Sequence, residues 1–553
     1  MRQGGRILVD QLVIHGAELA FCVPGESYLP VLDALSDVQD KIKLITCRHE
    51  SGASNMAEAY GKLTGTPGIC FVTRGPGATH ASIGVHTASQ DSTPMILFIG
   101  QVDSKFIERE AFQEIDYRRM FGSMAKWVAQ IDHAERIPEF VARAYQVATS
   151  GRMGPVVLSL PEDILFADAA TADARPWQRV ESAPTTDVIQ RLTTLLQEAE
   201  RPFLIVGGSG WNRSACVDLQ RFVETQALPV GCAFRFQDLI DNAHPNYAGD
   251  VGVGVNPELA ARIKASDLLM CIGARLGEMT TGGYELVNAP IPAQKLVHIH
   301  ASAEELGRVY QADLMINATM PAAIRLLAAL PRNTRAGIEA RTAKAHSALL
   351  AWQNRREIPG KLQLWEVLQH LNEALPADTI VTNGAGNYAG WVQRFYRYRG
   401  FRTQLAPTSG AMGYGVPAAI AAKVMHPERT VICFAGDGCF LMSGQEMATA
   451  IQYRANVVFI VVNNGMYGTI RMHQEREYPG RVHGTSLINP DFAAYAKSFG
   501  AHGEVVESTA AFAAALERAL NCGKPALLEL RVDPEGITPN ATLSAIRKAA
   551  QQR

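Results

Sequence analysis

An aspartate flanked by two glycines stands directly after an apolar run, in the segment VICFAGDGCF at Val431–Phe440. A second apolar run, FIVVNNGMYG, ends in two asparagines, and Asn464 lies 27 positions after Asp437. A carboxylate, an amide oxygen and a nearby main-chain carbonyl form a set of hard oxygen ligands, which suits Mg²⁺ or Ca²⁺. The flanking glycines let main-chain N–H groups approach phosphate oxygens closely. The two segments together predict a site for a divalent cation and a phosphate group.

Each segment alone is a weak signal, because Gly-Asp-Gly is usually a turn and Asn-Asn usually ends a strand. Their spacing adds information, since it fits a strand, a crossover helix over Gly444–Arg454 and a neighbouring strand. In an open parallel sheet, ligands bind at the carboxyl ends of the strands. We therefore expect Asp437 and Asn464 to lie side by side at one edge of a sheet.

The composition excludes several classes of protein. The chain has 553 residues, 47% of them hydrophobic and 19% charged, with a net charge of −2. This balance is typical of globular proteins, and no basic face indicates nucleic-acid binding. No apolar run reaches the roughly 20 residues that a membrane span needs, and the N-terminus lacks a signal core. The nine cysteines stand singly, which is typical of reduced thiols and favours a cytoplasmic protein without membrane partners.

The elements that must position these residues follow an alternating pattern. Short apolar strands such as TPMILFIGQ, RPFLIVGGSGW and ANVVFIVVNNG end in turns and alternate with helix-like segments. This rhythm predicts an α/β protein with three doubly wound parallel-sheet domains. We place the domains at residues 1–170, 188–335 and 360–540. A linker rich in Ala, Asp, Thr and Pro spans about residues 167–186, and a charged, mostly helical one spans about 330–363.

Gly-Asp-Gly followed after 24 residues by Asn-Asn resembles the diphosphate and metal motif of thiamine diphosphate enzymes. RHESGASNMAEAYGKLTG, FVTRGPGATHASIGVHTASQDSTPMILFIGQV, AFQEID, SGAMGYGVPAAIAAK and NPDFAAYAKSFG resemble the acetolactate synthase branch, large (catalytic) subunit. The resemblance covers essentially the whole chain. It implies a pyrimidine-binding first domain, a Rossmann-like central domain and a diphosphate-binding third domain. It also implies decarboxylation of a 2-keto acid, with pyruvate as the first choice, and carboligation to a second carbonyl.

The resemblance assigns roles residue by residue. Glu50 would hydrogen-bond N1′ of the aminopyrimidine and promote formation of the thiazolium ylid; otherwise it is a solvated glutamate at a helix start. Asp437 and Asn464 would bind Mg²⁺ through their side chains, and Met466 through its main-chain oxygen. The remaining cofactor contacts would come from Gly386, Asn387, Tyr388, Gly410, Met412, Gly436, Gly438, Cys439, Tyr467 and Gly468.

The substrate pocket departs from the family pattern. His473 stands where the family has tryptophan, and Glu26 where relatives have a small residue or serine. Gln113 matches a pocket glutamine, so all three are candidate catalytic residues, although His473 could equally be a surface histidine. Arg74 replaces a small residue, which adds either an anion contact or a surface charge. Arg275 matches an arginine that contacts the acceptor substrate.

Bound FAD is possible but disfavoured, because Leu276, Gly277 and Glu278 replace aspartates that the family associates with flavin. Because Glu50 and Asp437 lie in different domains, the resemblance implies a homodimer as the minimal active unit and favours a homotetramer. The alternatives are a sister decarboxylase or lyase acting on another 2-keto acid or an acyl-CoA, a non-catalytic homologue, and an NAD-dependent dehydrogenase. No GxGxxG with a following acidic residue supports the dehydrogenase.

Overall fold

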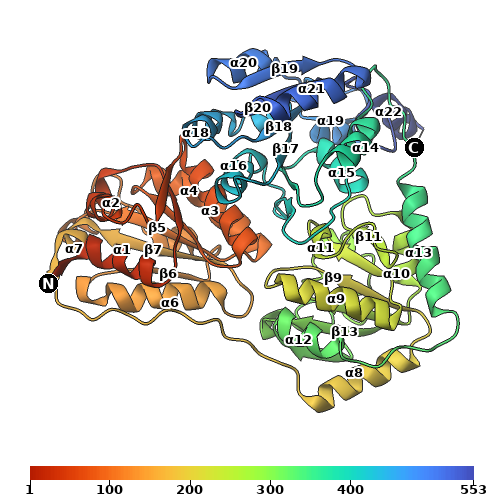
Figure 1. Ribbon diagram of the computed structural model, residues 1–553, viewed down its shortest axis with the longest axis horizontal. Coiled ribbons are helices and arrows are strands. Elements are labelled where there is room, and N and C mark those ends of the chain that lie inside the picture. The colour runs from red at the N-terminus through yellow and green to blue at the C-terminus, as the bar shows by residue number, and fades with distance from the viewer. Residues whose placement is uncertain (553) are drawn as a thin grey trace.

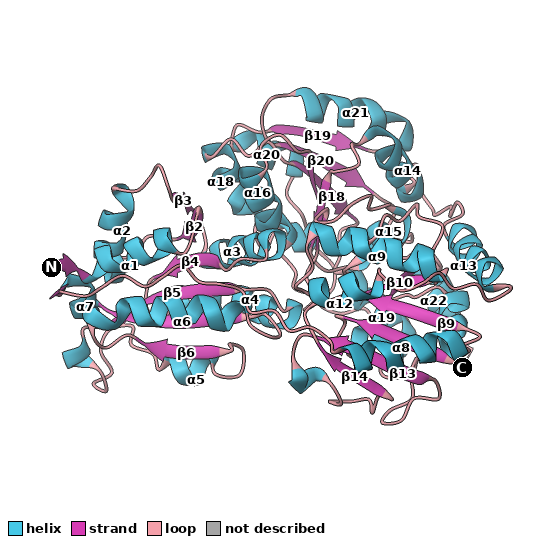
Figure 2. Cartoon of the chain, turned by 60° about the horizontal axis from the view of Figure 1, so that its bottom comes forward, coloured by secondary structure: helices cyan, strands magenta, loops and turns pink. Residues whose placement is uncertain are grey.

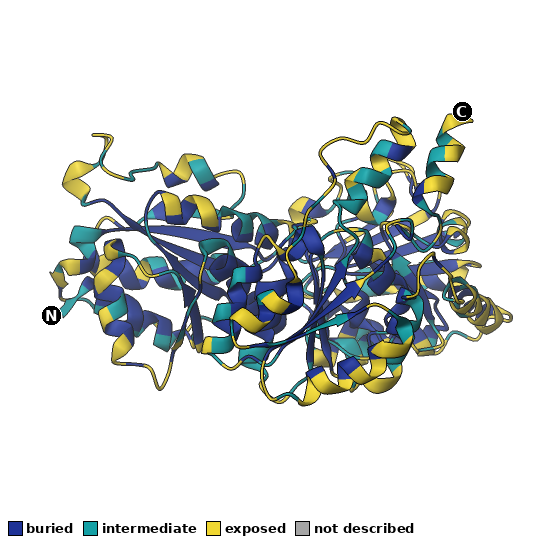
Figure 3. Cartoon of the chain, turned by 90° about the horizontal axis from the view of Figure 1, so that it is seen from above, coloured by how far each residue is buried: buried dark blue, intermediate teal, exposed yellow. Residues whose placement is uncertain are grey.

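A computed structural model describes residues 1–552. The chain folds into three main sheets, each of six parallel strands (Figure 1). Helices cover both faces of the sheets (Figure 2). The prediction of an α/β protein with three parallel-sheet units is confirmed. The strands are buried and the outward faces of the helices are exposed (Figure 3), as expected for parallel sheets enclosed on two sides.

The first sheet has the order β3-β2-β4-β5-β7-β6. Its strands are β2 (Leu19–Cys22), β3 (Lys43–Thr46), β4 (Gly68–Val72), β5 (Met95–Gln101), β6 (Trp127–Gln130) and β7 (Pro155–Pro161). Its helices are α1 (Gly4–Ile14), α2 (Leu29–Ser36), α3 (Glu50–Thr64), α4 (Pro76–Asp91), α5 (Tyr117–Phe121), α6 (Ile137–Thr149) and α7 (Glu162–Phe166). A short antiparallel pair, β1 (Arg2–Gln3) and β8 (Asp168–Ala169), joins the two ends of this unit.

The central sheet has the order β11-β10-β9-β12-β13-β14. Its strands are β9 (Pro202–Val206), β10 (Val230–Ala233), β11 (Tyr247–Val251), β12 (Leu268–Ile272), β13 (Lys295–His300) and β14 (Leu314–Asn317). Its helices are α8 (Thr186–Glu198), α9 (Arg213–Gln226), α10 (Pro257–Lys264), α11 (Glu278–Thr281), α12 (Met320–Leu327) and α13 (Ile338–Trp352).

The third sheet has the order β16-β15-β17-β18-β20-β19. Its strands are β15 (Ile380–Asn383), β16 (Gln404–Leu405), β17 (Val431–Gly436), β18 (Val458–Asn463), β19 (His502–Val506) and β20 (Ala526–Arg531). Its helices are α14 (Leu364–Ala374), α15 (Asn387–Phe395), α16 (Gly415–Met425), α17 (Asp437–Phe440), α18 (Met447–Gln452), α19 (Gly468–Glu477), α20 (Phe492–Ser498), α21 (Thr509–Asn521) and α22 (Leu543–Gln551).

The strand orders locate the binding edges. Counted along the chain, the strands of the first and third sheets follow the same order, 2-1-3-4-6-5, whereas the central sheet follows 3-2-1-4-5-6. In such sheets, ligands bind where the order reverses. In the third sheet this point lies between β15 and β17, the strands that end beside Gly386 and Gly436.

The crossover between β17 and β18 differs from its prediction. Instead of one helix over Gly444–Arg454, a 3₁₀ turn at Gly444–Glu446 leads into the short helix α18. The helix ends early because Arg454 takes a left-handed backbone conformation, with φ at 53°. The crossover still returns the chain to the neighbouring parallel strand.

The first and third units share one hydrophobic core. Helix α3 packs against α16, and Met56 and Tyr60 join Ile420 in the same buried cluster. The alanines along α16 let the two helices approach closely. The central sheet has separate apolar clusters on its two faces. Among residues 1–552, no helix combines the length and the apolarity that crossing a membrane demands.

Candidate active site

The carboxyl ends of β17 and β18 bring the two predicted metal-binding segments together. Asp437 directly follows β17, and strand register pairs Gly436 with Val462. The Gly465 N–H donates to Asp437 Oδ2 at 2.9 Å, and the Gly438 N–H donates to Oδ1 at 2.9 Å. The loop that carries Asn464 therefore contacts the aspartate, as the spacing of the two motifs predicted.

Asn489 is a neighbour that the sequence did not single out. Its amide nitrogen donates to Asp437 Oδ2 at 2.7 Å and to Asn463 Oδ1 at 2.9 Å. Its own Oδ1 is buried without a hydrogen-bond partner. A buried oxygen without a partner needs an explanation, and a bound water or ion is one. Asn489 thus orients the aspartate and leaves an oxygen available beside it.

Burial raises the pKa of Asp437, and the hydrogen bonds it accepts oppose that shift. A divalent cation beside the carboxylate would reverse the effect of burial, because it favours the charged form. The predicted oxygen donors are the Asp437 carboxylate, the Asn464 amide and the Met466 main-chain carbonyl. They fit Mg²⁺, which prefers one or two carboxylates together with phosphate oxygens.

Glycines keep the space above this edge open. A Cβ at Gly438 would lie 2.5 Å from Cε1 of Tyr467, so that a side chain cannot be added without moving the ring. Gly386 has φ at 144° and Gly410 has φ at 68°, both in the region that favours glycine. The loops around the edge therefore expose main-chain groups rather than side chains, which fits the diphosphate of the cofactor.

Cys439 joins three of the predicted cofactor loops. Its buried sulfur accepts from the Gly413 N–H at 3.2 Å and from the Tyr388 hydroxyl at 3.4 Å. The same hydroxyl accepts from the Gly384 N–H at 3.1 Å. Tyr388 and Cys439 therefore use their side chains to hold the loops together, and only their main chains remain for the cofactor. Met412, partly buried, packs against the same core.

Glu50 is the first residue of α3, where a helix N-terminus stabilises a carboxylate. Nδ1 of His80, in α4, lies 2.9 Å from Glu50 Oε2, and the rings of His80 and His49 are 4.4 Å apart. The preceding segment is fixed by Glu446, whose carboxylate accepts from the Arg48 and His49 N–H groups at 3.0 and 2.9 Å. His80 and Glu446 are further residues that the sequence did not single out.

Arg74 is not a surface charge, so that interpretation of it was wrong, and the alternative of a contact with a ligand anion stays a prediction. It is only 8% exposed, and it pairs with Glu26 at 2.9 Å and with Glu162. Its Nε donates to the Phe112 carbonyl at 3.3 Å, next to Gln113. These contacts occupy the guanidinium and place Glu26 and Gln113 on the same edge of the first sheet.

A cavity of about 1120 Å³ lies between the central and third units, and the C-terminal end of α4 in the first unit also lines it. Exposed His473 lines it from α19, and Asn387 lines it from α15. Arg275 and Glu278 line it from the central unit, and Arg275 Nε is 3.4 Å from Glu305. The volume suits a nucleotide, but the residues do not reproduce the acidic set that the resemblance associates with flavin. We therefore derive no step through FAD.

The candidate residues form two separate groups. Glu26, Glu50 and Gln113 belong to the first unit, and Asp437 and Asn464 belong to the third unit. Within residues 1–552, no hydrogen bond or ion pair joins Glu50 to the Asp437 loop, and its side-chain partner is His80.

Comparisons with known proteins agree with this division. Three family models for thiamine pyrophosphate enzymes match the chain: the N-terminal TPP binding domain at residues 2–120, the central domain at 189–327 and the C-terminal TPP binding domain at 384–530. The chain therefore belongs to the thiamine pyrophosphate enzyme family.

Two relatives within that family are named as large subunits of acetolactate synthase. The acetolactate synthase isozyme 2 large subunit of Escherichia coli is 31% identical over 538 residues, which cover 96% of this chain and 95% of the relative. The probable acetolactate synthase large subunit of Methanocaldococcus jannaschii is 32% identical over 557 residues, covering 97% and 93%. The chain is thus an acetolactate synthase-like member of the family.

Proposed function

We propose that this protein decarboxylates a 2-keto acid, with pyruvate as the favoured donor, and joins the remaining acyl unit to a second carbonyl. The reaction would depend on thiamine diphosphate and Mg²⁺. The observation that carries the proposal is the contact between the Asp437 and Asn464 loops at the ends of β17 and β18. The names of the relatives support the acetolactate synthase-like direction. We also propose that the three domains span residues 1–170, 188–335 and 360–540.

The residues of the chain divide the work. Asp437, Asn464 and the Met466 carbonyl would hold Mg²⁺, and the glycine-rich loops at residues 384–388 and 410–413 would hold the cofactor. When bound, thiamine diphosphate supplies a carbon nucleophile and accepts the electron pair that departing CO₂ leaves. Glu50 would hold a proton at its carboxyl group, opposite the aminopyrimidine. The overall reaction is redox-neutral, so that no step requires FAD.

The two groups of residues imply that a second copy completes the site. We propose a homodimer as the minimal active unit, and a homotetramer as the assembly. Co-expression of Glu50→Gln and Asp437→Ala chains tests this, because mixed dimers would contain one site with both residues intact. Statistical pairing should restore about a quarter of the wild-type activity in a symmetric dimer. Activity no higher than that of either variant alone would place both residues in one chain's site.

A sister reaction on another 2-keto acid or an acyl-CoA is the second candidate. It is favoured by His473 at the cavity and by the Glu26–Arg74 pair, both of which depart from the family pattern. Glu26, Gln113 and His473 would then select the substrate. All of these enzymes share the first chemical step, so that the cofactor site does not separate them.

The test is a turnover assay with pyruvate, thiamine diphosphate and Mg²⁺, without and with FAD, and with products identified by NMR. Acetolactate is the expected product. Glu50→Gln should keep the fold and cofactor binding but lose most turnover, whereas wild-type rates in this variant would refute the assignment. Asp437→Ala should abolish the metal-dependent binding of thiamine diphosphate measured by calorimetry. If the cofactor binds without turnover of pyruvate, a panel of 2-keto acids and acyl-CoA substrates identifies the sister reaction.

A further inference from the structure

Arg235 combines three unfavourable features in one residue. It follows β10, at the carboxyl end of the central sheet, and is 7% exposed. Its backbone φ is 70°, a left-handed conformation that is strained for a residue with a long side chain. Its Nε is buried without a hydrogen-bond partner. Such features persist where the surrounding structure holds them for a function.

The guanidinium of Arg235 makes no ion pair with any carboxylate among residues 1–552. Two buried carboxylates, Asp250 and Asp91, interact electrostatically with Arg235, but both have other partners. Asp250 accepts from Gln393, and burial raises its pKa to about 7; Asp91 pairs with Lys62. A buried charge without a counter-ion is costly.

Another arginine that lines the same cavity has hydrogen-bond acceptors for its guanidinium, which makes Arg235 distinctive. Arg394 donates to the Trp352 carbonyl at 3.0 Å and to Asn540 at 2.7 Å. Arg235 has only a stacking contact, with its guanidinium carbon 4.8 Å from the centre of the Phe234 ring. The lack of acceptors is therefore a property of Arg235 and is not shared by Arg394.

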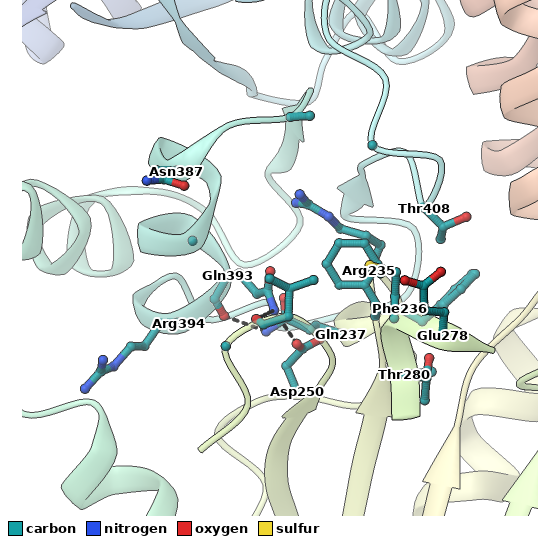
Figure 4. Close-up of a pocket in the computed structure, with 18 of the residues that line it drawn as sticks. Arg235, Phe236, Gln237, Asp250, Glu278, Thr280, Asn387, Gln393, Arg394 and Thr408 are labelled. Carbon is teal, nitrogen blue, oxygen red and sulfur yellow. Dashed lines mark hydrogen bonds between the residues drawn. The ribbon is translucent and has the colours of Figure 1, made fainter. Parts of the chain in front are cut away.

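The position of Arg235 indicates which kind of partner could bind its guanidinium. It lines the cavity of about 1120 Å³ between the central and third units. Figure 4 shows its side chain extending from the central unit toward the loops of the third unit, which carry Asn387 and Thr408. Gly386 and Gly410, both predicted to contact the cofactor, line the same cavity. A ligand bound beside the cofactor loops would therefore meet the guanidinium.

We propose that Arg235 is the centre of an anion-binding site that receives a carboxylate or phosphate group of a ligand bound in this cavity. The planar fork of a guanidinium matches the oxygens of either group. The site deepens the proposed function and rests on it for one point, that the cavity adjoins the cofactor. In addition to the pyruvate of the proposed function, it predicts a second ligand that is larger and more anionic, either a 2-keto acid with a second carboxylate or a phosphorylated compound such as a nucleotide.

Direct binding tests the site without turnover. Wild type, Arg235→Gly and Arg235→Lys are titrated with 2-ketoglutarate, pyrophosphate, ADP and FAD at constant ionic strength, by calorimetry and by thermal unfolding. Arg221→Met, on the exposed surface of α9, is the control for the loss of one positive charge. Glycine relieves the strain at φ 70°, so that Arg235→Gly should unfold at a higher temperature than wild type in the absence of ligand.

At least one anion should bind wild type and Arg221→Met, and should bind Arg235→Gly about 10- to 100-fold more weakly, the usual effect of losing hydrogen bonds to a charged group. Lysine should recover part of the affinity. Preference for 2-ketoglutarate identifies a substrate carboxylate, and preference for ADP or FAD identifies a nucleotide phosphate. Unchanged binding by Arg235→Gly, or no anion binding by wild type, would overturn the proposal.

Binding of thiamine diphosphate with Mg²⁺ is measured in the same variants and should not change. A loss confined to thiamine diphosphate would overturn the proposal by assigning Arg235 to the cofactor itself. The anion titrations do not depend on turnover. They can therefore be interpreted even if pyruvate is not a substrate, and each proposal can be refuted without the other.

Discussion

Replacing Asp238 with asparagine should flatten the pH dependence of stability. Asp238 lies in the turn after β10, is 8% exposed, and accepts from the Thr403 and Gln404 N–H groups at 3.1 and 3.3 Å. Burial raises its pKa from 3.8 to about 6. Between these values the folded state binds more protons than the unfolded state, so that stability falls as the pH rises.

The size of the effect follows from the pKa values. At about 1.4 kcal/mol per pH unit, the ionised carboxylate costs about 3 kcal/mol at pH ~7.5 and about 1 kcal/mol at pH ~4.5. Asp238→Asn should therefore gain about 2 kcal/mol relative to wild type across this interval. The amide nitrogen offers no acceptor to neighbouring N–H groups, so that the change with pH, rather than stability at one pH, is the quantity to compare.

Scanning calorimetry at the two pH values measures the effect. For a cooperative unit of 150–250 residues, about 2 kcal/mol corresponds to roughly 4–8 °C in Tm. Asp40→Asn, at an exposed turn, is the control and should show no such change. An equal difference between Asp238→Asn and wild type at both pH values would refute the reasoning, because it would mean that the buried carboxyl group does not titrate in this interval.

Two further substitutions test the packing around the site. Lys62→Met should lower the free energy of unfolding by about 3–5 kcal/mol, because it leaves Asp91 and Glu58 buried without their cation; urea unfolding measures the loss, and a change as small as that of a surface residue would contradict it. Gly438→Ala should cost about 1–3 kcal/mol and weaken binding of thiamine diphosphate, because the new methyl group meets Tyr467. Adding Tyr467→Leu should restore much of that affinity in calorimetry, and no recovery would mean that the ring is not the obstacle.

The sequence was sufficient to predict that the Asp437 and Asn464 loops meet, because strand ends and crossover length determine which loops lie together. Asp437 and the Asn464 loop each follow an apolar run, and parallel strands leave their carboxyl ends at one edge. The length of the crossover helix was overestimated, because a left-handed residue such as Arg454 gives no periodic signal. The fold class followed from the same alternation of strands and helices.

The neighbours that complete the site were not predictable in this way. Asn489 and His80 reach Asp437 and Glu50 through tertiary packing. Both lie in segments that carry the resemblance, but nothing in the local pattern distinguishes either residue from its neighbours. Arg235 is distinguished by partners that it lacks, which a sequence does not display. Arg74 was misinterpreted for a related reason, since its two carboxylate partners lie far away in the chain.

The shared strand order of the first and third sheets gives the chain an internal duplication at the level of topology. One copy contributes Glu50 after its second strand, and the other contributes Asp437 after its third strand. In the proposed function, one of these equivalent scaffolds would hold a proton and the other would hold a cation. A dimer of this chain would contain four such scaffolds, and each catalytic centre would join unlike halves of the duplication. Substitutions that exchange corresponding loops between the halves would therefore test which chemistry belongs to the scaffold and which to the loops.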